Sequence, residues 1–141
     1  MRYRRLAYRY TMVVATEAAP FQHPLWTLGG VRTGLAPQHW RPNTDVYETD
    51  TAIVVVAELA GMNEDDIEVQ LFEDAVLIEG TRELGRCEPG GVYHAVGIRQ
   101  GGFRLEVPLT AAIDAEGVEA RYDRGVLRIR LPKRTEAAHG R

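Results

Sequence analysis

Residues 118–133, VEARYDRGVLRIRLPK, predict two short β-strands joined by a tight turn. Apolar side chains alternate with charged ones in both halves of the stretch: Val118, Ala120 and Tyr122 in the first, Leu127, Ile129 and Leu131 in the second. This period of two is typical of a strand that buries one face, because successive side chains point to opposite sides. Gly125 can adopt a positive φ in the turn, and Pro132 ends the ladder because it has no N–H to donate. The stretch therefore predicts a β-hairpin.

Further strand-length segments, separated by turn residues, precede this hairpin. We expect strands over residues 44–48, 52–59, 67–71, 76–78, 92–98 and 103–109. The segment 52–59 is almost continuously apolar, which favours a central strand covered on both faces. Together with the hairpin these segments make eight short strands without a long helical period. This pattern predicts an all-β sandwich.

The chain resembles the α-crystallin domain of small heat-shock proteins. The motif A-x-Y-x-x-G-V-L-x-I-x-L-P-K at 120–133 is similar to the closing signature of that domain. Five weaker matches precede it in the family's order: PNTDVYE at 42–48, AELAGM at 57–62, EDDI at 64–67, VLIEGTR at 76–82 and GGF at 101–103. The resemblance covers roughly residues 41–133 and implies an immunoglobulin-like β-sandwich. Residues 1–40 would then form an N-terminal arm and residues 134–141 a short C-terminal extension.

The proposed arm differs in composition from the rest of the chain. Large apolar residues are spread between prolines and glycines, so no long amphipathic helix can form there. In the family the corresponding arm contacts unfolding proteins, and the resemblance implies this client-binding role for Phe21, Leu25, Trp26, Leu28 and Trp40. The alternative is that these side chains pack as ordinary core of the same chain.

The first ten residues are basic, with tyrosines between the arginines. This composition could serve as a nucleic-acid patch or a transit peptide, but we favour a solvated or partner-packed basic arm, because short basic starts are common. The overall net charge is −3, which provides no general attraction for nucleic acid or for a membrane surface. We therefore expect neither as a partner.

Catalytic and metal-binding patterns do not emerge from the sequence. The acidic run at 64–68 lacks the glycine spacing of a calcium loop, and the four histidines lack paired metal-ligand spacing. Cys87 is the single cysteine, which fits a reducing compartment, and we expect a cytoplasmic protein. We predict no enzyme activity, no cofactor and no metal site.

Residues 81–101 form a long excursion between two predicted strands. In bacterial and plant-type small heat-shock proteins, a strand in this loop pairs with an edge strand of the partner subunit. The resemblance therefore implies a reciprocal homodimer, because an unpaired edge accepts a further strand. Its interface residues would come from the edge strand and the loop: Thr44, Val46 and Tyr47 from the first, Tyr93, His94, Val96 and Ile98 from the second.

Two positions depart from the family pattern. Leu105 stands where the family commonly has an arginine, while Arg104 should face the other side of its strand, near Glu106. Residues 134–141 also lack the family's C-terminal I-x-I/V motif, which fills a groove on a neighbouring subunit. The corresponding groove here would be lined by Ile67, Val69, Leu71, Val118, Ala120 and Tyr122. Either the N-terminal arm fills that groove or it stays open to clients, and we expect a dimer or small oligomer.

The resemblance implies an ATP-independent holdase, which binds unfolding proteins and prevents their aggregation. The alternative from another class is a co-chaperone-like adaptor with a related sandwich that recognises a folded partner. Such adaptors usually lack the exchanged strand, so the predicted strand at 92–98 favours the holdase.

Overall fold

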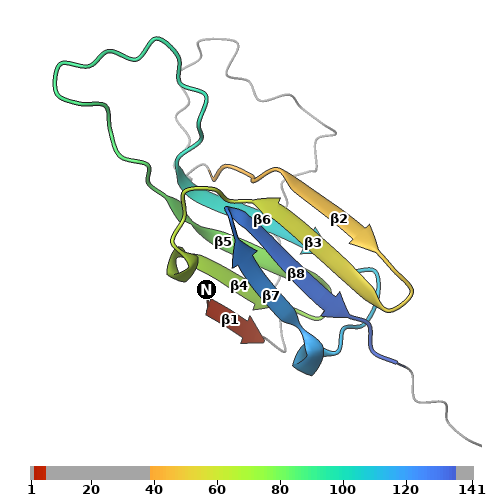
Figure 1. Ribbon diagram of the computed structural model, residues 1–141. Coiled ribbons are helices and arrows are strands. Elements are labelled where there is room, and N and C mark those ends of the chain that lie inside the picture. The colour runs from red at the N-terminus through yellow and green to blue at the C-terminus, as the bar shows by residue number, and fades with distance from the viewer. Residues whose placement is uncertain (1, 6–38, 136–141) are drawn as a thin grey trace, which may run out of the picture.

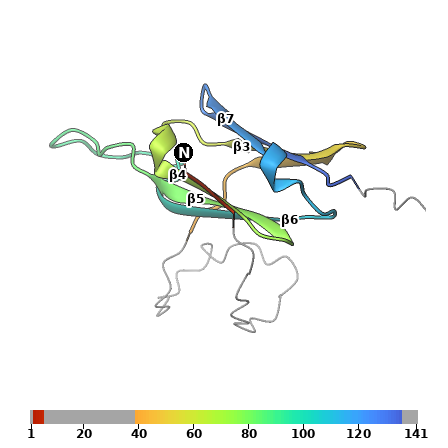
Figure 2. The ribbon, with the colours of Figure 1, turned by 90° about the horizontal axis from the view of Figure 1, so that it is seen from below.

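The computed structural model describes residues 2–5 and 39–135, which form two four-stranded sheets stacked as layers (Figures 1 and 2). The first sheet has the order β1 (Arg2–Arg5), β4 (Ile67–Leu71), β5 (Ala75–Arg82) and β6 (Gly101–Pro108). The second has the order β2 (Thr44–Glu48), β3 (Ala52–Glu58), β8 (Val126–Pro132) and β7 (Glu119–Asp123). Two short 3₁₀ helices, η2 (Glu64–Asp66) and η3 (Ala115–Gly117), lie in connections. The expected all-β sandwich is confirmed.

The core lies between the two sheets and consists of the inward-facing half of each strand. Burial alternates along β4, β6 and β8, as the period of two requires. The largest fully buried side chains come from both layers: Phe103, Leu59, Ile67, Ile78, Leu105, Leu127, Ile129 and Leu131. Among the described residues no polar or charged residue is buried, so this core gains its stability from apolar burial.

The β7–β8 hairpin closes as the sequence predicts. Asp123 pairs with Val126, which leaves Arg124 and Gly125 as a two-residue loop with φ of 51° and 80°. Two successive positive φ angles define a type I′ turn, whose twist matches that of the flanking strands. The Leu59 N–H donates to the Gly125 carbonyl at 2.7 Å, and this bond connects the turn to the end of β3.

Seven of the eight expected strands are present. Residues 92–98, which were expected to form a strand with a partner subunit, form none in the single chain, and that pairing stays a prediction. Those residues form no ladder with any segment that the structure describes, so they remain a loop. The eighth strand is β1, which pairs in parallel with β4 and was not expected from its basic composition.

Leu105 is fully buried in the core, at the position where the family commonly has arginine. Arg104 faces the opposite side of β6, as expected from the alternation. Its closest carboxylate is that of Glu79, its cross-strand neighbour on β5, at 3.0 Å. The expected partner Glu106 is at 4.0 Å. The position where the family commonly has arginine is therefore an apolar core position in this chain. Arg104, its neighbour in sequence, forms its ion pair within its own sheet.

Candidate interaction surfaces

The strand β2 lies at the edge of its sheet and has β3 as its neighbour. Val46 faces the same side as the buried Val55, yet 49% of its surface is exposed because no further strand covers it. Tyr47 on the outer face is 46% exposed, and its hydroxyl accepts a hydrogen bond from Arg128 at 2.8 Å. The edge thus offers apolar surface on both faces together with backbone groups that an added strand can pair with.

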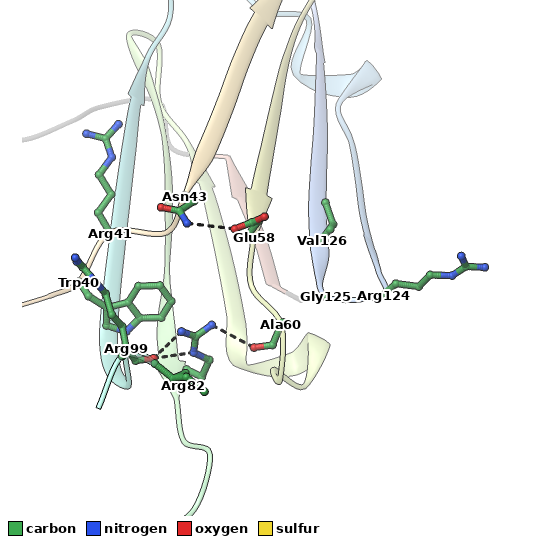
Figure 3. Close-up of a pocket in the computed structure, with 12 residues that line it drawn as sticks. Trp40, Arg41, Asn43, Glu58, Ala60, Arg82, Arg99, Arg124, Gly125 and Val126 are labelled. Atoms are coloured by element: carbon green, nitrogen blue, oxygen red, sulfur yellow. Dashed lines mark hydrogen bonds between the residues drawn. The ribbon is translucent and has the colours of Figure 1, made fainter. Parts of the chain in front are cut away.

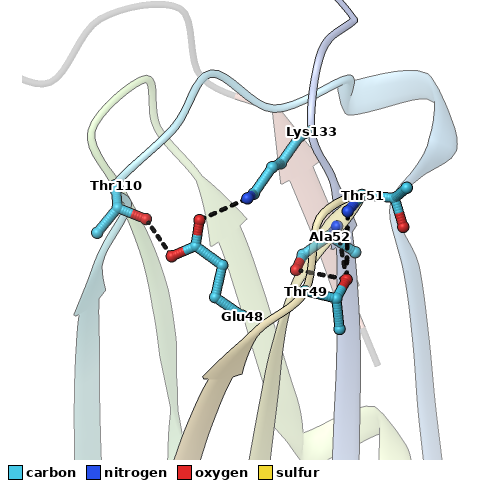
Figure 4. A network of polar contacts seen from close by, with 6 residues as sticks. All are labelled: Glu48, Thr49, Thr51, Ala52, Thr110 and Lys133. Carbon is cyan, nitrogen blue, oxygen red and sulfur yellow. Dashed lines mark hydrogen bonds and ion pairs between the residues drawn. The ribbon is translucent and has the colours of Figure 1, made fainter.

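The end of β2 is held by the carboxylate of Glu48 (Figure 4). One oxygen lies 2.5 Å from Lys133 Nζ, just beyond β8, and the other accepts a hydrogen bond from the Thr110 hydroxyl at 2.9 Å. These contacts join β2 to the loop after β6 in the other sheet. The hydrogen bond from Lys133, followed by that from Thr110, lowers the pKa of Glu48 below its ordinary value. The edge strand is therefore positioned by a charged contact at the margin of both sheets.

The loop of residues 83–100 connects β5 to β6 and projects away from both sheets (Figures 1 and 2). Its apolar side chains point into solvent, with exposed fractions of 77% for Val92, 56% for Tyr93, 77% for Val96 and 64% for Ile98. His94 and Cys87 are exposed as well. An apolar strip of this kind on an extended segment is typical of a surface that binds another chain.

Arg82 fixes the base of this loop (Figure 3). Its Nε and Nη2 donate to the carbonyl of Arg99 at 2.9 and 2.6 Å, and Nη1 donates to the Ala60 carbonyl at 3.3 Å. The guanidinium also lies over the indole of Trp40, 4.2 Å from the ring centre. The two ends of the loop are therefore held together while its tip remains exposed.

A cleft of about 450 Å³ separates the loop base from the β7–β8 turn. Four arginines line it: Arg41, Arg82, Arg99 and Arg124. In Figure 3 the side chains of Arg41 and Arg124 extend away from the centre of the cleft, while Asn43 donates to Glu58 at 3.2 Å. The charged groups therefore do not converge on one point, and the cleft is a depression between structural elements.

The expected groove residues divide into two groups. Ile67, Val69 and Leu71 on β4 point into the core and are almost completely buried. Val118, Ala120 and Tyr122 near β7 are half-buried against the same core. The outer edge of β4 is paired with β1, which belongs to the expected N-terminal arm. The role of the groove in binding a client or a neighbouring subunit stays a prediction.

Four of the five expected client-binding residues, Phe21, Leu25, Trp26 and Leu28, lie outside the described residues. Trp40 is described, and it packs with the sandwich. Its ring centre lies 5.3 Å from that of Phe103, and its indole N–H donates to the Gly101 carbonyl at 3.1 Å. Its backbone also bridges to β6 through Gly102 and Arg104. Only part of the indole therefore remains accessible to another protein.

Within residues 2–5 and 39–135, no three histidine, cysteine, aspartate or glutamate side chains are grouped as metal ligands. No helix among these residues combines the length and the apolar composition needed to cross a bilayer.

The two-layer sandwich, with an edge strand at β2 and a long exposed loop before β6, defines an all-β protein of the immunoglobulin-like sandwich class. A model of the Hsp20/alpha crystallin family matches residues 45–141, and the chain belongs to that family. It is 32% identical over 95 residues to small heat shock protein C2 of Rickettsia felis, which covers 67% of this chain and 62% of the relative. It is 36% identical over 100 residues to spore protein SP21 of Stigmatella aurantiaca, covering 71% of this chain and 59% of the relative.

Solved structures agree with this assignment. A small heat-shock protein from Xylella fastidiosa superposes with a TM-score of 0.65 at 31% identity, covering 74% of this chain and 95% of that one. Heat shock protein 16.0 of Schizosaccharomyces pombe gives a TM-score of 0.66 at 26% identity, covering 77% and 78%. The chain spans about three-fifths of the length of the first two curated relatives.

Proposed function

We propose that the protein is an ATP-independent holdase that binds apolar segments of unfolding proteins and keeps them from aggregating. The observation that carries this proposal is the sandwich fold that the chain shares with small heat-shock proteins of solved structure. Membership of the Hsp20/alpha crystallin family supports it. A protein that binds only the unfolded state holds its client by mass action and needs no nucleotide for that step.

The β2 edge and the exposed loop are proposed to pair between two copies of the chain. An added strand alternates its side chains across the sheet, as β2 does. Val96 and Ile98 would then lie on the core side beside Val46, while Tyr93 would lie on the outer face beside Tyr47. This reciprocal exchange covers the apolar surface of both segments and gives 92–98 the backbone partners that it lacks within one chain.

The dimer is tested by comparing Val46→Asp and Val96→Asp with Val126→Asp in sedimentation velocity. Val126 is a suitable control because it is exposed on β8 but lies away from the β2 edge. We expect the first two variants to shift toward monomer, since each places a charge in the proposed interface, while Val126→Asp sediments like the parent. Equal sedimentation of all three variants, at concentrations where the parent is a dimer, would contradict strand exchange.

The holdase activity is tested on a heat-labile client without nucleotide. The full chain is compared with a chain lacking residues 1–38 and with Phe21/Leu25/Trp26/Leu28→Ser. The deletion ends before Trp40 because that residue packs against Phe103. Suppression by the full chain, lost in both variants, would place the clients on the N-terminal arm. Suppression by all three would place them on the sandwich. Failure of the full chain at several-fold excess would favour an adaptor for a folded partner.

A further inference from the structure

The long loop between β5 and β6 is closed at its base by contacts between its two ends. Arg82, the last residue of β5, pairs in the ladder with Gly101, the first residue of β6. Its guanidinium donates twice to the carbonyl of Arg99, at 2.9 and 2.6 Å. The Leu84 N–H donates to the side-chain oxygen of Gln100 at 3.0 Å. These contacts set the direction in which the loop leaves the sandwich.

The tip of the loop has hydrogen bonds of its own. The Cys87 N–H donates to the Tyr93 hydroxyl at 3.0 Å, and the Gly91 N–H donates to the Glu88 carbonyl at 2.8 Å. Gly90, between these last two residues, has the positive φ of 81° that a tight turn requires. The loop therefore carries an ordered tip on a closed base, and a change of direction at the base moves the whole tip.

The base of the loop is also connected to the segment that enters β2. The Arg82 guanidinium lies 4.2 Å from the centre of the Trp40 indole (Figure 3). The indole N–H in turn donates to the carbonyl of Gly101 at 3.1 Å. Residues 41–43 lead from Trp40 to Thr44, the first residue of β2. One guanidinium thereby contacts both the base of the loop and the residue that leads into the edge strand.

Hydrogen bonds hold the short segment between Trp40 and β2 in one arrangement. The carbonyl of Asn43 accepts from the Glu58 N–H at 2.9 Å, and its side-chain amide donates to the Glu58 carboxylate at 3.2 Å. The Thr44 hydroxyl donates to the Pro42 carbonyl at 2.9 Å. The position of Trp40 and the start of β2 are therefore linked by a segment with little freedom to adjust.

The exchange proposed above uses two surfaces of each chain at once, the loop as donor and the β2 edge as acceptor. In a two-fold dimer each copy donates its loop to the β2 edge of the other, so the angle between the two surfaces must suit both contacts. Once one contact has formed, the other is effectively intramolecular, and this gain is lost when the geometry prevents both from forming together. The group that fixes the loop relative to β2 within one chain therefore controls the affinity of the dimer.

We propose, on the basis of that dimer, that Arg82 is the positioning residue of the strand exchange and holds the loop at a fixed orientation to the β2 edge of its own chain. Its third contact, from Nη1 to the Ala60 carbonyl at 3.3 Å, anchors the guanidinium just beyond the end of β3. Lysine at this position keeps the charge, but a compact ammonium cannot reproduce the planar fork that makes these bonds while stacking on the indole.

A distance between two spin labels in one chain tests this positioning directly. The labels are placed on Cys87 in the loop and on Asp45→Cys in β2, which are both exposed, and labelled protein is diluted with excess unlabelled protein. We expect a narrow distance distribution when Arg82 is present and a clearly broader one in Arg82→Lys. Val76→Ala is the control, because it opens a cavity in the core at the opposite end of β5. Equal distributions with Arg82 and with lysine would overturn the proposal.

Sedimentation equilibrium tests the consequence for the dimer. We expect Arg82→Lys to raise the dimer dissociation constant at least about tenfold, because the two contacts no longer form together. Val76→Ala should stay close to the parent, and so should Arg99→Lys, since Arg99 takes part through its backbone carbonyl. An equal increase in Val76→Ala would show that dimer affinity follows the stability of the sandwich, and the positioning role would be wrong.

The variants Val46→Asp and Val96→Asp separate the role of Arg82 from the exchange itself. If both become monomeric while Arg82→Lys dimerises like the parent, the exchange stands and Arg82 does not position it. If both sediment like the parent dimer, the exchange is wrong, and Arg82 has no donor strand to position.

Discussion

The guanidinium of Arg82 lies 4.2 Å from the centre of the Trp40 indole and donates twice to the carbonyl of Arg99. Arg82, at the start of the exposed loop, thereby connects Trp40, which precedes β2, to Arg99 at the other end of the loop. We predict that Arg82→Lys lowers the free energy of unfolding by about 1–2 kcal/mol, since lysine lacks the planar fork that makes both bonds.

The measurement is urea unfolding followed by Trp40 fluorescence in a Trp26→Phe background. Arg99→Lys is the matched control, because Arg99 takes part through its backbone carbonyl. If both substitutions lowered stability equally, the role assigned to the Arg82 fork would be wrong.

Gly80 lies opposite Phe103 in the β5–β6 ladder, and a Cβ there would approach the Asp66 carbonyl oxygen to 2.3 Å and the Phe103 ring to 2.8 Å. Gly80→Ala should therefore destabilise the protein by about 1–3 kcal/mol through overpacking. Gly97→Ala is the control, because a Cβ at that position meets nothing within 4 Å. Urea midpoints measured for both variants check the prediction, and a Gly80→Ala variant as stable as Gly97→Ala would refute it.

Arg124 has a φ of 51° in the type I′ turn. An arginine is strained in this conformation, whereas asparagine adopts it readily. Arg124→Asn should raise the free energy of unfolding by about 0.5–1 kcal/mol. Gly125→Ala should have the opposite effect, since φ there is 80° and the new Cβ would lie 2.8 Å from Ala60. Thermal unfolding shows whether each substitution raises or lowers the stability of the protein. An Arg124→Asn variant less stable than the parent would contradict this account of the turn.

Glu48 contributes stability that depends on pH. Its pKa in the folded state lies below the ordinary value of 4.5, so the contribution is present above about pH 4.5 and is lost as the pH falls through the lowered pKa. The Tm of the parent should exceed that of Glu48→Gln at neutral pH, and the two curves should converge in acid.

Differential scanning fluorimetry from about pH 3 to 8 measures this difference. Glu119→Gln on β7 controls for the loss of one negative charge. A gap between parent and Glu48→Gln that stays constant over the whole range would show that ionisation of Glu48 is not its cause.

The strands that alternate were predictable because their local pattern and their tertiary environment agree. Phe103, Leu105 and Val107 face the core, and the charged residues between them face solvent. The segment 92–98 shows the opposite case. Its composition favours a strand, but it pairs with none of the segments described in the single chain, and its apolar side chains remain exposed. Strand propensity alone cannot supply the hydrogen-bonding partner that a strand requires.

The sequence missed the residues that hold the interaction surfaces in place. Glu48, Thr110 and Lys133 are far apart along the chain and have no shared spacing, so only the fold shows their contact. Arg82 ends the VLIEGTR motif at 76–82, but its bonds to Ala60 and Arg99 depend on how two loops approach each other. Polar contacts between segments that are far apart in the sequence produce no periodic pattern, so they cannot be predicted from the sequence.

By itself, the sequence determined the sandwich, the hairpin turn at Gly125 and the choice of core residues, because alternation and turn chemistry act over a few neighbouring residues. The tertiary structure alone decided that β1 covers β4, that Trp40 packs on Phe103 and that Val46 stays exposed at an edge. Each of these outcomes depends on which segments lie side by side after folding. The pairing of segments that are remote in sequence is set by the packing of the whole domain, so a local sequence pattern cannot predict it.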